Sequence, residues 1–469
     1  MPDTRYKTVT SRLRNSEVQL AGVVASLYAT SFGGLSWIML WVAINTGPDN
    51  IDLDAIGGSW SGCLNGVRAT FPLAVFALWP IYLILSGRGV IRRATLPEKL
   101  WIFYGFVCIV ATVYVEPWFD FAYWGFAWFS VFASIEMYMQ ERRDSLDCAI
   151  ALNRLTWLLC SFVLISVVWV GRGALTAETA TGLSGYGVNS RLPTVGGMPM
   201  VRATGIARLA AIPALLSFVW VWNTSGVARG ISAAVFPPTL YLVWVMQSRG
   251  ATASFACAIL FSLILMGGRG RRISFAVLAL VGVICVCGFI SNDSIHHAYL
   301  YAMRGEEGQV LSSMSGRTTI FRESLAAIGN APYIGYGPQA DRLSNIGNAQ
   351  NSILYALLSG GFIGGSGFVA GLAVAWLMLF RVLRRRHLLR PVERLTLIQT
   401  ASVLAFFTMR SYPENGAALY SVDLLVMLPA IVFIAEADRK LQRILRTGVV
   451  RGLADQAARG SYRASCSSA

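Results

Sequence analysis

Long apolar stretches recur along nearly the whole chain and alternate with short polar or basic segments. A bilayer core about 30 Å thick is crossed by about 20 residues of helix. In lipid such stretches must be helical, because every backbone N–H and C=O needs a partner within its own segment. The pattern therefore predicts an all-α fold, a polytopic membrane helical bundle of about twelve transmembrane helices. The apolar runs lie at about 18–45, 71–86, 99–115, 122–139, 155–171, 205–224, 231–247, 251–267, 273–290, 351–380, 395–410 and 421–436.

The polar segments divide the chain into three parts. Residues 1–17 are a predicted cytoplasmic segment, residues 18–436 the transmembrane bundle, and residues 437–469 a basic cytoplasmic tail that we expect to be disordered. The first apolar run is too long for the core of a cleavable signal peptide, which indicates an uncleaved signal anchor. Within the bundle, 291–350 is the longest polar connection and the predicted large periplasmic loop, and long ordered loops are usually functional.

The composition supports a membrane protein and removes nucleic acid as a partner. The chain is 55% hydrophobic and 13% charged, whereas soluble domains carry about 25% charged residues. Its formal charge is +15. If the runs alternate from a cytoplasmic N-terminus, most basic residues, such as Arg92-Arg93 and Arg384-Arg385-Arg386, fall on the cytoplasmic side. Membrane topology thus accounts for the charge and predicts both termini in the cytoplasm. The eight cysteines and three histidines suggest neither a disulfide framework nor a metal site.

Arginines predicted on the outer side stand out, because the positive-inside rule disfavours them there. Arg249 is the sharpest case, since it lies in QSRGATAS between two apolar runs with almost no loop. Ionisable residues at that depth usually face a cavity or a partner, and a planar, permanently charged fork suits a phosphate or pyrophosphate. The alternative, that Arg249 snorkels at a helix end, stays open. The outer arginines are Arg202, Arg208, Arg249, Arg304, Arg317, Arg322 and Arg410.

The predicted large loop contains a helix of its own. It begins near Ser315, which suits an N-cap, and ends at the Gly329-Asn330 pair before Pro332. Its apolar positions recur at helical spacing, at Phe321, Leu325 and Ile328. One apolar and one polar side predict a helix lying along the membrane surface. A glycine-rich turn, YIGYGPQADR, follows, and the small-residue run at 360–367 in the next apolar stretch predicts close helix packing.

A series of short motifs follows in order between about 200 and 370. The matching strings are Ser248-Arg249-Gly250-Ala251, Met303-Arg304-Gly305, Ser315-Gly316-Arg317-Thr318-Thr319-Ile320-Phe321, Pro332-Tyr333-Ile334-Gly335-Tyr336-Gly337 and Ala349-Gln350-Asn351-Ser352-Ile353-Leu354. In this order and spacing they resemble the bacterial O-antigen ligase and polysaccharide polymerase superfamily. Outside that range the resemblance is one of topology, with the termini inside and the largest loop outside.

The resemblance implies a metal-independent glycosyltransferase of the bacterial inner membrane that needs no cofactor. Its donor would be a glycan on undecaprenyl pyrophosphate. Its saccharide acceptor would be lipid A-core in a ligase or another lipid-linked repeat unit in a polymerase, and membrane lipids and a chain-length regulator would be further partners. Arg249 and Arg317 would bind the pyrophosphate and stabilise the charge that grows on the bridging oxygen. The remaining substrate-binding residues would be Arg202, Arg208, Arg304, Arg322, Arg410 and Asn351.

One position departs from the pattern of the family. Ligases carry a histidine where this chain has Gln350, and a glutamine can hydrogen-bond but cannot take a proton at neutral pH. This favours a polymerase over an O-antigen ligase. It also makes Glu414, beside Arg410 in RSYPENG, the candidate catalytic base. The alternative for Glu414 is a loop carboxylate that pairs with Arg410.

Two other classes of protein stay open as alternatives. A transporter or flippase for a lipid-linked saccharide should show charged residues along several helices, whereas the charges here are predicted to concentrate at the outer face. A non-catalytic assembly partner would keep the fold without the chemistry, and Gln350 leaves room for it.

Overall fold

The computed structural model describes residues 31–46, 60–86, 92–116, 118–140, 145–170, 191–194, 198–246, 248–267, 317–343 and 349–466. Several predictions fall elsewhere and lie outside the described residues. They concern the segment 1–17, the apolar run 273–290, and the loop residues Arg304 and Ser315.

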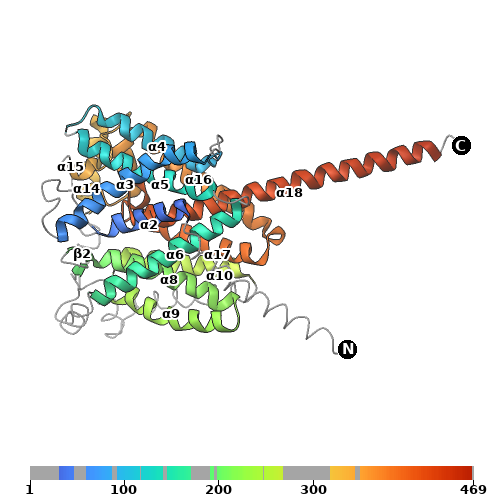
Figure 1. Ribbon diagram of the computed structural model, residues 1–469, viewed down its shortest axis with the longest axis horizontal. Coiled ribbons are helices and arrows are strands. Elements are labelled where there is room, and N and C mark those ends of the chain that lie inside the picture. Colours follow the sequence, from blue (N-terminus) through green and yellow to red (C-terminus); the bar gives the residue numbers. More distant parts are fainter. Residues whose placement is uncertain are drawn as a thin grey trace, which may run out of the picture.

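Within the described residues the protein is a helical bundle with one small pair of strands (Figure 1). The strands β1 (Arg191–Thr194) and β2 (Met198–Arg202) pair antiparallel, with Arg191 opposite Arg202. Two short 3-10 turns are η3 (Arg386–Leu388) and η4 (Gly416–Ala418). The helices are α2 (Phe32–Thr46), α3 (Trp60–Leu85), α4 (Leu96–Thr112), α5 (Trp118–Gln140), α6 (Ser145–Val170), α8 (Ala203–Asn223), α9 (Val227–Val245), α10 (Arg249–Met266), α14 (Arg317–Asn330), α15 (Ala340–Leu343), α16 (Ser352–Arg384), α17 (Pro391–Arg410) and α18 (Val422–Cys466).

The predicted class, a polytopic helical membrane protein, is confirmed. Five described helices contain windows long and apolar enough to cross a membrane, at Gly66–Leu85, Ser145–Trp169, Thr204–Asn223, Arg249–Met266 and Ser352–Arg384. Most observed helices overlap the predicted runs closely, but α3 begins at Trp60, eleven residues before the start of the run predicted at 71–86. The total of about twelve crossings stays a prediction.

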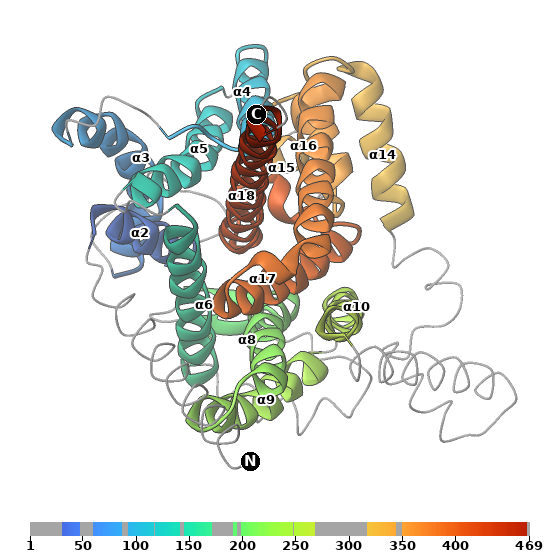
Figure 2. The same cartoon turned by 90° about the vertical axis from the view of Figure 1, so that its right-hand side faces the viewer.

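Helix α18 forms the axis of the bundle. Figure 2 shows it nearly end-on, with α4, α5 and α16 on one side and α6, α8 and α17 on the other. It packs against α6, α16 and α17, and all of its side chains from Val422 to Asp438 are buried. A helix that is apolar all round belongs in a protein interior, which explains why this last hydrophobic run lies at the centre.

The same helix departs from expectation beyond the bundle. The sequence predicted a disordered tail from residue 437, whereas α18 continues to Cys466 and projects well beyond the other helices (Figure 1). Its exit is held by ion pairs from Arg439 to Glu436 at 2.7 Å and from Lys440 to Glu393 at 2.6 Å. These contacts fix the helix where it leaves the core, and no proline interrupts the sequence that follows.

Helix α16 is broken at Gly361, where φ is 59° and ψ is −165°. This backbone conformation is essentially restricted to glycine. A broken membrane helix must satisfy the freed backbone groups within the protein, and the glycine-rich turn at 332–337 does so on both sides of the break. Four backbone hydrogen bonds carry this pairing: Tyr336 N to Leu358 O at 2.9 Å, Gly337 N to Ser359 O at 2.8 Å, Phe362 N to Pro332 O at 2.7 Å and Ile363 N to Tyr333 O at 3.1 Å.

The other glycines of this stretch let α16 approach α4 closely, as the small-residue run predicts. A Cβ atom built on Gly364 would lie 3.1 Å from Val107, and one built on Gly371 would lie 2.4 Å from Trp101. Larger residues at these positions would push the two helices apart. The glycine run therefore serves both close packing and the break at Gly361.

A cluster of charges closes the bundle at one end. Arg92, only 12% exposed, donates to Glu98, to Glu136 at 3.3 Å and to Glu436 at 2.9 Å. Glu436 lies thirteen residues after Asp423 on α18, which places the two carboxylates about 20 Å apart along the axis. Buried charge therefore lies at both ends of the bundle, and the expectation that it concentrates at the outer face is incomplete.

Candidate functional site

The other end of the bundle, which we call the site end, is where α17 finishes and α8, α10, α16 and α18 begin. In Figure 1 the labels α14, α15 and β2 mark this end, on the left. The connection 411–421 crosses it between α17 and α18. This connection, which we call the crossing segment, contains Glu414, follows directly on Arg410, and contacts Asn351 and Gly250, the neighbour of Arg249.

Two predicted arginines meet on one carboxylate at the site end. The guanidinium of Arg208, on α8, donates to Asp423 at 2.7 Å, and that of Arg410, the last residue of α17, donates to the other oxygen of the same carboxylate. Arg410 and Asp423 are buried, with 5% and 1% of their side chains exposed, whereas Arg208 is 19% exposed. Asp423 therefore balances only one of the two arginine charges, and Glu414 lies close enough to Arg410 to act on the other. We call Arg208, Arg410 and Asp423 the arginine centre.

The crossing segment also holds the start of α16. Ser352 N donates to Ser411 O at 2.8 Å, and the Ser352 hydroxyl donates to Glu414 O at 2.9 Å. The amide of Asn351 donates to Tyr412 O at 3.1 Å, while its side-chain oxygen accepts from the backbone N–H groups of Ile353 and Leu354 at 2.9 and 3.0 Å. Asn351 is therefore the N-cap of α16, a structural use of the residue that we predicted to bind substrate.

Arg249 enters the same neighbourhood through the first turn of α10. Its neighbour Gly250 packs so closely on the crossing segment that a Cβ atom there would lie 3.0 Å from Pro413 Cγ. Arg249 itself is half-buried and is the first residue of α10, after the cap position Ser248. A cation in the first turn opposes the helix macrodipole, so helix stability does not explain an arginine at this position.

The two non-arginine candidates flank this contact. Glu414 is half-buried on the crossing segment and close enough to Arg410 to interact with its charge. Gln350 is half-buried directly before the N-cap of α16, with a φ of 46°. A left-handed backbone is uncommon for a residue with a side chain, and such positions cluster at functional sites.

A buried aspartate that the sequence analysis did not select fixes the turn at Gln350. Asp341, fully buried on α15, accepts from the backbone N–H of Ala349 at 3.1 Å and from the amide of Asn415 at 3.3 Å. It thereby ties the residue before Gln350 to the crossing segment. Asp423 was missed in the same way, although a lone acid at the start of an apolar run is a signal that could have identified it.

The remaining candidates lie apart from the arginine centre or cannot be placed. Arg317 is the half-buried first residue of α14 and Arg322 is exposed on the same helix. The other end of α14 packs through Ile328 near Phe121 and Leu358, so the start of α14 lies away from α4 and α5, on the side of α10 (Figure 2). Arg202 ends β2, and its side chain is not described.

These observations define a class of protein: a polytopic helical membrane protein with two arginines on one buried carboxylate, and a strained turn at Gln350, at the same end of the bundle. Residues 233–369 match the family described as O-antigen ligase. The match confirms, for this segment, the resemblance to the O-antigen ligase and polysaccharide polymerase superfamily. It spans α10, α14 and the first half of α16, and so includes Arg249, Arg317 and Gln350. No curated protein matches the chain.

Proposed function

We propose that this protein is a membrane glycosyltransferase that transfers a glycan from a polyprenyl pyrophosphate to a saccharide acceptor. One observation carries the proposal: the crossing segment brings Arg410, the turn containing Arg249 and the start of α16 together at one end of the bundle. The family match over residues 233–369 supports an enzyme of this kind. A dianionic pyrophosphate fits an end of the bundle that carries Arg208, Arg249 and Arg410 together with several helix N-termini.

The proposed reaction is a displacement at the anomeric carbon of the donor sugar. The acceptor hydroxyl oxygen forms the new bond, the bond from the anomeric carbon to phosphate breaks, and the pyrophosphate leaves with the electron pair. Arg249 and Arg317 stabilise the charge that grows on the bridging oxygen. Glu414 takes the proton of the acceptor hydroxyl, and Gln350 orients that hydroxyl by hydrogen bonding.

A polymerase is favoured over a ligase within this proposal. Gln350 supplies no proton acceptor at the position where ligases have a histidine. The ligase is the second candidate, because the matching family is described by that activity. A deletion strain separates the two: single lipid-linked repeats accumulate if the protein is a polymerase, and full-length chains on undecaprenyl pyrophosphate accumulate if it is a ligase.

The test of the proposed pyrophosphate site uses residues outside the Asp423 ion pairs. Arg249→Ala and Arg317→Ala should abolish long-chain polysaccharide in cells while protein levels stay unchanged. Arg249→Lys keeps the charge but loses the bidentate fork, so we expect partial activity. The matched control is Arg229→Ala, which removes an exposed arginine from the first turn of α9. Normal chain length in both alanine variants would refute the proposed pyrophosphate site.

Independence of a metal ion is a separate part of the proposal. Arginines would supply the positive charge that a divalent cation supplies in other glycosyltransferases. Purified protein in nanodiscs, supplied with a lipid-linked glycan, should therefore keep its rate of transfer in a chelator. Loss of activity in chelator, with recovery on adding Mg²⁺ or Mn²⁺, would show that the arginines do not suffice.

A further inference from the structure

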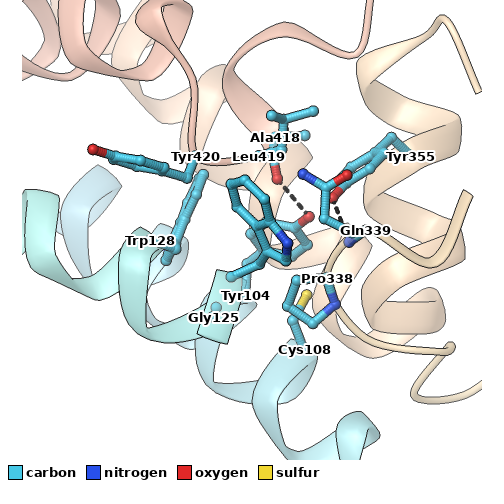
Figure 3. Close-up of a pocket in the computed structure, with 12 residues that line it drawn as sticks. Tyr104, Cys108, Gly125, Trp128, Pro338, Gln339, Tyr355, Ala418, Leu419 and Tyr420 are labelled. Carbon is cyan, nitrogen blue, oxygen red and sulfur yellow. Dashed lines mark hydrogen bonds between the residues drawn. The ribbon is translucent and has the colours of Figure 1, made fainter. Parts of the chain in front are cut away.

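A pocket lined by aromatic side chains lies against the crossing segment, which contributes Ala418, Leu419 and Tyr420 to its lining (Figure 3). Figure 3 shows Tyr420 and Trp128 on one side and Gln339 and Tyr355 on the other. Two hydrogen bonds fix its walls: the Tyr104 hydroxyl donates to Ala418 O at 2.8 Å, and Gln339 N donates to the Tyr355 hydroxyl at 2.8 Å. The walls are therefore rigid and come from α4, α5, α16 and both connecting segments.

Two buried polar atoms in this pocket have no partner in the protein. They are the side-chain oxygen of Gln339 and the indole N–H of Trp128, in residues that are 3% and 4% exposed. One is an acceptor and the other a donor. An apolar occupant would leave both unsatisfied at a cost in binding. A hydroxyl group suits either atom, because it can donate to the first and can accept from the second.

The dimensions of the pocket limit what enters it. It encloses about 300 Å³ when its open mouth is counted, but its enclosed part has room for only about one water molecule. The inner part therefore holds one hydroxyl group or one water and not a sugar ring. The mouth lies at Trp124, Pro338 and Leu419, which are partly exposed, while the other lining side chains are more deeply buried.

The backbone at Gln339 adopts a strained conformation that the surrounding structure must stabilise. Its φ is 61°, and within the described residues the only other non-glycine residue with a positive φ is Gln350. Such strain persists only where the surroundings enforce it, and it is found at ligand contacts. The two strained glutamines flank α15 and the turn that Asp341 anchors, so the pocket and the proposed acceptor position share one support.

We propose that this pocket is a subsite for one hydroxyl group of a saccharide bound at the site end. The side-chain oxygen of Gln339 accepts from that hydroxyl, and the indole N–H of Trp128 donates to it. The aromatic walls exclude water and leave the sugar ring at the mouth, against Trp124. This inference rests on the proposed function for the identity of the ligand. The hydroxyl group can belong either to the saccharide acceptor or to the donor glycan.

The test removes each polar atom, and controls with the same substitutions account for the change in side-chain size. Gln339→Leu and Trp128→Phe are the test variants. Gln399→Leu and Trp157→Phe are the controls, because these side chains are also buried with an unpartnered polar atom but do not line the pocket. Transfer by each purified protein in nanodiscs is measured with lipid-linked glycan extracted from a strain that lacks the protein.

Both test variants should raise KM about tenfold for one substrate, with kcat within about twofold, while the controls stay unchanged. The substrate whose KM rises identifies the source of the hydroxyl. Among deoxy analogues of that substrate, one should bind the wild type more weakly than the complete substrate does. Gln339→Leu should bind that analogue and the complete substrate equally. Unchanged KM values for both substrates in folded test variants, or equal effects in the controls, would overturn the subsite.

A second measurement covers variants that fail to fold and separates this inference from the proposed function. Saturation-transfer NMR with methyl glycosides of common hexoses detects saccharide binding to the wild-type protein without any transfer. Binding without transferase activity would keep the subsite and reject the proposed function. Transfer without saccharide contact, and with KM values insensitive to every deoxy analogue, would keep the function and reject the subsite.

Discussion

Asp423 offers the sharpest test of the arginine centre, because one buried carboxylate serves two arginines. Asp423→Ala leaves Arg410 buried without its partner, whereas Arg208, 19% exposed, can turn toward solvent. Removal of one partner from a buried ion pair costs about 3–5 kcal/mol, and we assign most of that cost to Arg410. Domains are stable by only about 5–15 kcal/mol, so this single change should sharply lower the amount of folded protein.

The assay is thermal unfolding of detergent-purified protein, followed by its level in membranes. A double variant, Asp423→Leu with Arg410→Met, replaces the buried pair by apolar side chains of similar size, and such replacements are often neutral or stabilising. We therefore expect the double variant to recover most of the lost stability. If Arg410 also binds substrate, the recovered protein stays inactive. An unchanged unfolding midpoint in Asp423→Ala, or a double variant as unstable as the single one, would refute this reasoning.

Three further predictions concern the elements that support the site. Gly361→Ala should lower the free energy of unfolding by about 3 kcal/mol or more, because the backbone there is restricted to glycine and the new Cβ would lie 2.2 Å from Tyr333. In the control, Gly329→Ala, the new Cβ meets nothing within 4 Å. Equal thermal unfolding midpoints for the two variants would contradict the break in α16 at Gly361. Asn351→Ala should cost about 1 kcal/mol through loss of the helix cap, with Asn351→Ser nearly neutral; a loss of transfer in both would indicate a substrate contact as well. Burial opposes ionisation of Glu393, but hydrogen bonds from Lys440 and Arg390 outweigh it and hold the pKa of Glu393 below its usual range. A depressed pKa contributes stability that is present above about pH 4.3 and is lost as the pH falls further. Below that pH the wild type should therefore lose this contribution, whereas Glu393→Gln does not have it to lose. Unfolding of both proteins at several pH values measures the difference.

The helices could be predicted because lipid leaves the backbone no alternative to internal hydrogen bonding. The predicted run at 205–224 became α8 and that at 251–267 became α10, each within two residues at either end. The end of α18 was missed because its exit from the core depends on ion pairs to distant residues, such as Lys440 to Glu393. A hydropathy pattern carries no information on such pairs.

The candidate site could be predicted only in part, for a similar reason. The rarity of outer arginines identified Arg208 and Arg410, but their common partner Asp423 lies 215 residues from the first of them. Asn351 was selected for its place in a motif, whereas its contacts show a helix cap. The buried Asp341 carries no local signal at all, since its role arises from a contact with the crossing segment.

The two glycine-rich strings of the sequence are best understood as one structural unit. Neither the turn at 332–337 nor the run at 360–367 is self-sufficient: the first lacks regular structure, and the second breaks a membrane helix. Each supplies the backbone partners that the other leaves unsatisfied, which is the condition for non-helical backbone at membrane depth. Because backbone groups make this pairing, the side chains of the turn are available for other contacts. The Tyr336 hydroxyl donates instead to Ala327 O at 3.1 Å and fixes α14 against the break. Because α14 carries Arg317, the geometry of this backbone pairing sets where that arginine stands relative to Gln350 at the start of α16.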